Sequence, residues 1–172
     1  YLAVGIVSSA LPGTLYGFFL GYLGVSSYVY ATAAQVVSLP WSFKLFIGMT
    51  NDCFPLRGLS RKPYMMIGWT ICTLSLVSIA CVPMPAQGSQ EVGVISALMT
   101  LAACGYIIAD VAADVLLVEI AKKEMDDVRG TTQTNVYLMR TIGTVIVSLL
   151  VGLGMNGKEY SGTMDSSPLS FT

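Results

Sequence analysis

The sequence predicts an all-α fold, a bundle of helices that each cross a membrane. Hydrophobic residues make up 54% of the 172 positions and charged residues only 11%. A soluble domain carries about 25% charged residues, because water must solvate its surface. Apolar runs long enough to cross a bilayer recur along the chain, and the loops between them alternate between basic loops and loops without lysine or arginine. The formal net charge of −1 offers no basic patch, so we expect a lipid bilayer as partner and no nucleic acid.

Each span is recognised by its length. A helix rises about 1.5 Å per residue, so about 20 mostly apolar residues cross the roughly 30 Å hydrocarbon layer. Because lipid offers no partner to backbone N–H and C=O groups, spans must be helices or strands of a closed barrel. Long runs without strict alternation of apolar and polar residues favour helices. The predicted spans cover residues 2–19, 28–50, 64–82, 92–121 and 133–155.

The first and fourth runs have individual features. Pro12 and Gly13 interrupt the first run, and they predict either a kink used in a transport cycle or a proline that a membrane helix simply tolerates. The fourth run, 92–121, is long enough to project beyond the membrane. All the connections are short, so consecutive helices should be antiparallel neighbours in one bundle.

The distribution of lysine and arginine in the short loops predicts the orientation. The loops after the first and third runs contain neither residue, whereas those after the second and fourth contain Arg57, Arg61, Lys62, Lys122, Lys123 and Arg129. Short cytoplasmic loops are enriched in positive charge. We therefore expect a multi-pass integral membrane protein with both basic loops in the cytoplasm and Tyr1 beginning on that side. The odd number of spans and the start at Tyr1 indicate a fragment with further helices to follow.

The sequence offers neither a metal site nor a cofactor site. It contains no histidine, which removes imidazole ligands and histidine-based catalysis. The four cysteines form no C-x-x-C pair, so they resemble neither a zinc site nor a disulfide framework. We expect them to be small packing residues.

The end of the second run and the loop after it form the first informative motif. Gly48 is small enough for a neighbouring helix to approach closely. Asp52 lies at the C-terminal end of the predicted helix, where its charge opposes the helix dipole. It therefore requires a cation, which Arg61 or Lys62 can supply, while Gly58 permits a tight turn in the loop. The motif predicts either a charged gate or a helix cap combined with ordinary positive-inside topology.

Charged side chains inside the apolar runs form the second motif. Asp110 and Asp114 lie one turn apart on one helix face, and each carboxylate in hydrocarbon costs about 2.5–3.5 kcal/mol. Arg140 is too deep in the fifth run to reach water, and Lys44 lies within the second. We expect a shared polar interior in which Arg140 neutralises one carboxylate, so that the other can carry a proton. A purely structural ion pair between helices is the alternative.

Two further residues are assigned from their neighbours. Trp41 lies three residues before Lys44, and we expect it to line a cavity rather than to belong to the aromatic belt at the membrane surface. Glu119 lies near the end of the fourth run. We expect it to join a loop network with Lys122 or Arg129.

Together these motifs resemble the folate–biopterin transporter family of the major facilitator superfamily. Members carry Pro-Trp and then a lysine in the second helix, a glycine and an aspartate at its end, and a loop with proline, glycine, paired basic residues and Pro-Tyr. The residues that fit this order are Pro40, Trp41, Lys44, Gly48, Asp52, Pro55, Gly58, Arg61, Lys62, Pro63 and Tyr64. The two aspartates of the fourth run, and Arg129-Gly130 followed by the buried Arg140, are also similar. Asn51, Arg57 and Ser60 depart from the pattern.

The resemblance implies part of the N-terminal six-helix half of a transporter, and no enzyme. It implies secondary active transport of a pteridine, such as folate or biopterin, by alternating access, with protons as a candidate coupling ion. The gate would consist of Gly48, Asp52, Gly58, Arg61 and Lys62. Trp41 could stack on an aromatic solute, and Lys44 and Arg140 could pair with its negative charge.

Three other functions compete with this interpretation. A major-facilitator transporter of another organic anion or nutrient would share the motifs. A non-transporting membrane scaffold or receptor would not need opposite charges buried on three helices. An intramembrane aspartyl protease would need two facing carboxylates that share a proton, whereas Asp110 and Asp114 lie on the same predicted helix.

Overall fold

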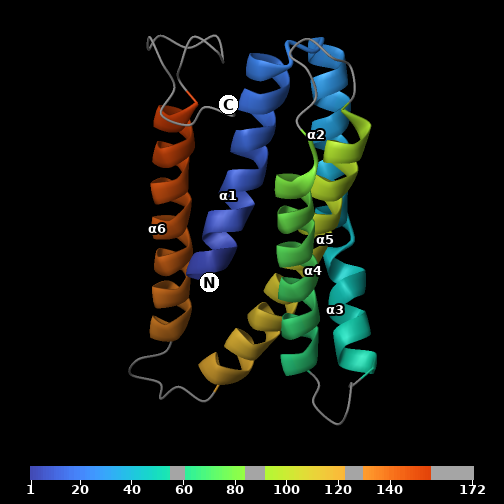
Figure 1. The fold of residues 1–172 in the computed structure, drawn as a ribbon. Coiled ribbons are helices and arrows are strands. Elements are labelled where there is room, and N and C mark those ends of the chain that lie inside the picture. Colours follow the sequence, from blue (N-terminus) through green and yellow to red (C-terminus); the bar gives the residue numbers. More distant parts are fainter. Residues whose placement is uncertain (55–60, 84–91, 123–129, 156–172) are drawn as a thin grey trace.

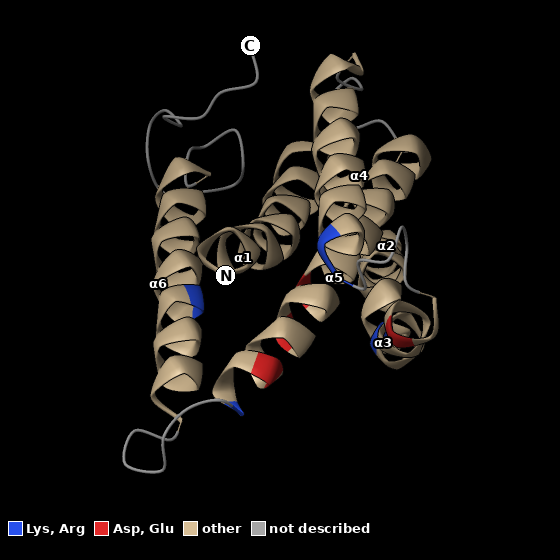
Figure 2. Ribbon diagram, turned by 90° about the horizontal axis from the view of Figure 1, so that it is seen from below, with Lys and Arg blue, Asp and Glu red and all other residues tan. Residues whose placement is uncertain are grey.

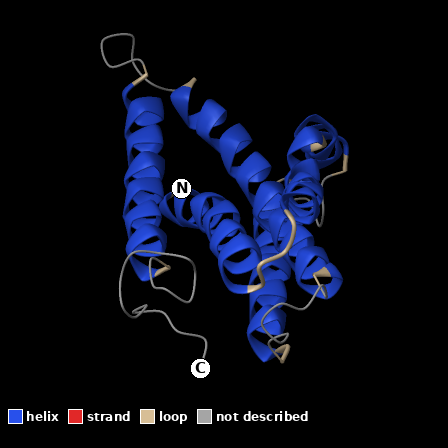
Figure 3. Cartoon of the chain, turned by 90° about the horizontal axis from the view of Figure 1, so that it is seen from above, coloured by secondary structure: helices blue, strands red, loops and turns tan. Residues whose placement is uncertain are grey.

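The computed structural model describes residues 1–54, 61–83, 92–122 and 130–155, and all regular structure in these ranges is helical (Figure 3). The all-α prediction is confirmed. Figure 1 shows the helices packed side by side as a bundle. In chain order they are α1 (Leu2–Tyr16), the π-helical η1 (Gly17–Tyr22), α2 (Ser27–Ser42), α3 (Lys44–Cys53), α4 (Lys62–Cys81), α5 (Gly93–Ala121) and α6 (Thr131–Gly154).

Among the described residues, four helical stretches are long and apolar enough to cross a membrane: Leu2–Tyr22, Lys62–Cys81, Gly93–Ala121 and Thr131–Gly154. They correspond, to within a few residues, to the first, third, fourth and fifth predicted spans. The polytopic character predicted from composition is therefore confirmed. Pro12 lies inside α1, which continues through it to Tyr16.

The second predicted span, 28–50, is not one continuous helix. It is divided into α2 and α3 at Phe43, whose φ of −91° and ψ of 4° are not helical. Pro40 precedes the break and has no N–H to donate to the helix ladder. The Phe43 N–H instead bonds to the Pro40 carbonyl at 3.1 Å, in a tighter turn than the α-helix makes. That α2 and α3 together cross the membrane once remains a prediction.

Helices α4 and α5 pack in antiparallel contact across two glycines. A Cβ atom on Gly68 would lie 2.6 Å from the Gly105 carbonyl oxygen. A Cβ atom on Gly105 would lie 2.6 Å from the Cys72 amide nitrogen. Both distances are too short for a real contact, so this crossing requires glycine at both positions. Small residues let membrane helices approach in this way.

Helices α1 and α6 run parallel to each other along a seam of small residues. A Cβ atom on Gly5 would collide with the Arg140 carbonyl oxygen of α6. Further along, the Ser9 and Ser148 hydroxyl oxygens are 2.9 Å apart. Interhelical hydrogen bonds of this kind hold membrane helices together where lipid provides no hydrophobic drive.

The ends of the helices define a basic end of the bundle. The C-terminal ends of α3 and α5 and the N-terminal ends of α4 and α6 lie at the same end (Figure 1). Helix α1 runs away from this end, in the same direction as α6 (Figure 1). That Tyr1 begins on the cytoplasmic side remains a prediction. Because Leu2 packs against Gly143, α1 begins beside the middle of α6.

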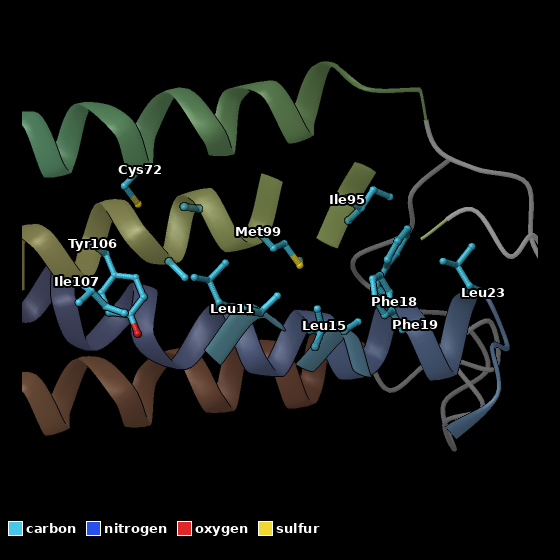
Figure 4. Packing of buried hydrophobic residues seen from close by; sticks show 14 of the residues in the cluster. Leu11, Leu15, Phe18, Phe19, Leu23, Cys72, Ile95, Met99, Tyr106 and Ile107 are labelled. Atoms are coloured by element: carbon cyan, nitrogen blue, oxygen red, sulfur yellow. The ribbon is translucent and has the colours of Figure 1, made fainter. Parts of the chain in front are cut away.

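The hydrophobic core lies toward the opposite end, between α1, η1, α2 and α5, and Cys72 of α4 joins it (Figure 4). Phe19 and Ile107 are almost completely buried in it. By contrast, the outer faces of α4 and α6 expose large apolar side chains such as Leu74, Leu149 and Leu153. Apolar outer faces of this kind suit contact with lipid chains.

Candidate functional site

A cluster of four charged side chains lies where α3, α5 and α6 face one another; we call Lys44, Asp110, Asp114 and Arg140 the charge cluster. Lys44 is the first residue of α3, directly after the break at Phe43. Its Nζ donates to Asp110 Oδ2 at 2.9 Å and to Asp114 Oδ2 at 2.8 Å. One ammonium group therefore bridges two carboxylates that lie one turn apart on α5.

Asp110 is the most deeply buried member, with none of its surface exposed. Its second oxygen, Oδ1, lies 3.5 Å from Arg140 Nη1. Burying a charge is costly unless it is paired. The Asp110 carboxylate is paired with two cations, Lys44 and Arg140. Arg140 was expected to neutralise one carboxylate of the pair, but the structure makes Lys44 the nearer cation for Asp110.

Asp114 has a different environment. Its side chain is 33% exposed, and its Oδ1 accepts a hydrogen bond from the Tyr1 hydroxyl at 3.1 Å. Tyr1 was not found by the sequence analysis. The level at which α1 meets α5 depends on the parallel packing of α1 on α6, and no local pattern in the sequence signals that.

The charge cluster brings together residues far apart in the sequence and has no net formal charge, since two cations face two carboxylates. Figure 2 shows acidic residues grouped along α5, with a basic residue on the side of α6 nearest to it. Because its charges cancel, the cluster can be buried. A carboxylate in it could still accept a proton in place of its cation, and a cation could pair with a charged group of a ligand instead.

Trp41 extends the charge cluster toward α2. Lys44 Nζ lies 4.8 Å from the centre of the Trp41 ring, within the roughly 6 Å of a cation–π contact. Trp41 also lines a cavity of about 390 Å³ between α1, α2 and α5. The aromatic ring thus stands between this cavity and the charges.

At the basic end, Arg61 joins three helices. Its Nη2 lies 2.8 Å from Glu119 Oε1, at the end of α5, and 3.7 Å from Asp52 Oδ1, at the end of α3. The expected pair of Asp52 and Arg61 therefore forms, but the shorter contact is with Glu119. The sequence predicts a network of Glu119 with Lys122 or Arg129, and of these Arg129 lies outside the described residues.

The other predicted gate residues contribute less to this geometry. A Cβ atom on Gly48 would lie 3.6 Å from Val111 Cγ1, an ordinary contact, so α5 does not come close enough to require glycine there. Lys62 is exposed and pairs with no acidic side chain in the part of the chain that the structure describes. Gly58 lies outside that part.

A buried amide near Arg61 was not singled out as functional. Asn51 is only 2% exposed, and neither of its side-chain polar atoms has a partner among the described residues. Arg61 Nη1 is likewise buried without a partner. A buried unpaired group of this kind costs about 1–3 kcal/mol. The basic end therefore retains hydrogen-bonding capacity that its described contacts do not use.

Metal binding finds no support in the part of the chain described. No group of three or more His, Cys, Asp or Glu side chains there could hold a metal ion. Cys53, Cys72, Cys81 and Cys104 are all free thiols, two buried or half-buried and two exposed.

Comparison with known proteins agrees with the membrane architecture. The model of the BT1 family matches residues 5–163. Over 122 residues the chain is 28% identical to the Arabidopsis thaliana protein named probable folate-biopterin transporter 4; the match covers 71% of this chain and 24% of that protein. Over 46 residues it is 35% identical to folate transporter 1 of Plasmodium falciparum (isolate 3D7), covering 27% of this chain and 9% of that protein.

These matches concern only part of each relative. The chain spans about a quarter of the length of the Arabidopsis protein and about a tenth of the Plasmodium protein. No solved structure matches the chain. The geometry of the charge cluster is therefore known from this structure and not from a solved relative.

Proposed function

The chain belongs to the BT1 family, and from this premise we propose that it serves in the transport of a folate- or pteridine-like solute across a membrane. It is an integral, multi-pass membrane protein. Within the proposal, it supplies part of the N-terminal six-helix half of a major-facilitator transporter. The names of its relatives support the substrate class.

The observation that carries the proposal is the charge cluster. Charged side chains inside a membrane are expensive, and they commonly mark substrate or ion pathways. Folate carries carboxylates and a flat aromatic ring system. Lys44 and Arg140 can pair with such carboxylates, and Trp41 offers a ring for stacking.

Alternating access is the mechanism that we propose. The charge cluster links α6 to α3 and α5, so a bound anion that competes for Lys44 would loosen one of these links. At the basic end, the contacts of Arg61 tie α3, α4 and α5 together. We propose that these contacts form the gate that closes and opens as the cluster changes partners.

Protons are the proposed coupling ion. A proton on one carboxylate would remove the charge that Lys44 now neutralises, and Lys44 would then be able to pair with the solute. One ammonium group contacts both carboxylates, so a change at either one alters the pairing of Lys44. Proton uptake and substrate binding would thereby act on the same side chain.

The competing functions fit the site less well. A protease would need the two aspartates to share a proton, whereas both are engaged by Lys44. A scaffold or receptor would have no use for four charges inside the bundle. Transport of another organic anion uses the same cluster and is the strongest rival.

An uptake assay separates these functions. The complete protein, reconstituted in liposomes, should take up labelled folate or biopterin faster than an unrelated dicarboxylate. Accumulation of the dicarboxylate alone would favour the rival transporter. Failure to move any of these solutes would favour a scaffold or receptor.

A further inference from the structure

We propose that the cavity between α1, α2 and α5 binds the flat heteroaromatic ring of the solute, while the charge cluster binds its acidic end. This inference rests on the transport function proposed above. It assigns the two ends of one solute to two adjoining binding sites, the cavity and the charge cluster. The ring site is lined by apolar side chains together with Tyr30, Gln35, Ser38, Trp41 and Tyr106.

The cavity has the size and composition of a small-molecule site. Its volume of about 390 Å³ lies in the lower part of the roughly 300–1,000 Å³ range of ligand pockets. This accommodates a bicyclic ring, whereas a longer solute would extend beyond it. Leu11, Leu15 and Ile107 are buried hydrophobic side chains in the lining, so the ring would be held against apolar walls.

Two polar side chains of the lining form no hydrogen bond with another described residue. Tyr106 is 9% exposed, and its hydroxyl takes part in none of the hydrogen bonds formed by the described residues. Figure 4 shows its ring between α5 and α1. Gln35 is exposed on α2, and its side-chain amide forms no hydrogen bond with another described residue; its backbone carbonyl accepts a bond from Ser38.

These two groups match the edge of a pterin-like ring. Such an edge carries hydrogen-bond donors and acceptors side by side, like an amide. A glutamine amide offers a donor and an acceptor together, and a tyrosine hydroxyl can act as either. A mostly apolar pocket with a few placed polar groups is the usual form of a specific small-molecule site.

The cavity adjoins the charge cluster at Trp41. Trp41 lines the cavity, and its ring centre lies 4.8 Å from Lys44 Nζ. A ring that stacks on Trp41 inside the cavity would therefore direct its substituent toward Lys44. The arrangement favours a solute with a flat ring at one end and a negative charge at the other.

A second cavity lacks these features. About 260 Å³ in volume, it lies between α1, α4, α5 and α6. Its lining is apolar apart from Thr14, whose hydroxyl already donates within α1 at 2.7 Å. The lining therefore offers no unused polar group that could hydrogen-bond to the edge of a heterocycle.

Direct binding of two probe compounds tests the inference. Pterin has the ring without the acidic tail, and p-aminobenzoylglutamate has the tail without the ring. Calorimetric titration of the complete purified protein should show binding of both. We expect Tyr106→Phe and Gln35→Leu each to weaken pterin binding roughly two- to tenfold, the worth of one hydrogen bond, and to leave the tail compound unaffected.

Tyr28→Phe is the matched control, because Tyr28 is exposed on α2 and lies outside the cavity. It should change neither affinity, and equal melting temperatures would show that all variants fold. The inference is overturned if pterin does not bind, or if it binds all variants equally. Binding that follows this pattern without any pteridine uptake would instead contradict the proposed function and leave the ring site standing.

Discussion

Lys44 and Asp110 meet at 2.9 Å, directly beside the point where the second apolar run breaks into two helices. The same lysine reaches Asp114 at 2.8 Å, whereas Arg140 approaches Asp110 only to 3.5 Å. Lys44 is therefore the residue on which the charge cluster most depends.

Replacing Lys44 should destabilise the bundle and stop transport. In Lys44→Met, Asp110 stays buried without its nearer cation, and losing one partner of a buried pair costs about 3–5 kcal/mol. Since Lys44 is itself partly exposed, we expect the lower end of that range, measured by unfolding in detergent. Arg140→Gln should cost less. Lys62→Met, at an exposed lysine, is the control; a loss as large in the control would contradict this role of Lys44.

The two aspartates should differ when they are neutralised. Asp114 is partly exposed, and among the described residues only Lys44 pairs with it, so water and protons can reach Asp114 more readily than Asp110. We expect Asp114→Asn to abolish accumulation driven by a proton gradient in liposomes while leaving exchange of solute. Asp110→Asn should mainly reduce the amount of folded protein. Unchanged accumulation in both variants would leave these aspartates as structural partners only.

At the basic end, Glu119 should matter more than Asp52. Glu119→Gln removes the 2.8 Å contact of Arg61, whereas Asp52→Asn removes the one at 3.7 Å. Both acids are exposed, so stability should change by less than about 1 kcal/mol. The expected effect is a slower transport rate at normal membrane expression, larger for Glu119→Gln. Wild-type rates in both variants would reduce Arg61 to a topology signal.

Cysteine labelling can test whether α2 and α3 together cross the membrane. With the native cysteines replaced, single cysteines at Ser26, Lys62 and Pro83 are exposed to an impermeant reagent. Ser26 and Pro83 should react from one side and Lys62 from the other. Reaction of Ser26 and Lys62 from the same side would mean that the broken segment does not span.

The spans with an unbroken apolar pattern could be predicted closely from the sequence. Length alone located 92–121, for which the structure gives Gly93–Ala121. The same criterion missed the break at Phe43, because hydropathy depends on residue type, and a phenylalanine is equally apolar whatever its backbone dihedral angles. Hydropathy indicates whether a segment lies in lipid or in water. It says little about where the helix within that segment is broken.

The members of the charge cluster could also be predicted, because an unpaired charge in lipid is too costly to be left alone. Their pairing could not. Whether Lys44 or Arg140 is nearer to Asp110 depends on the break in the second run and on the helix crossings. The cavity residues Gln35 and Tyr106 were missed as well, since an amide or a phenol in an apolar run gives a much weaker signal than a charge.

The crossing of α4 and α5 at Gly68 and Gly105 also restricts the evolutionary paths open to this chain. In most packed cores, growth of one side chain can be compensated when its neighbour shrinks. Here both partners are already the smallest residue, and each faces the other helix's backbone. Any substitution must therefore displace a whole helix, and displacing α5 would carry Asp110 away from Lys44. A lineage that loses either glycine is expected to recover by reversion, because no second-site change can restore the missing space.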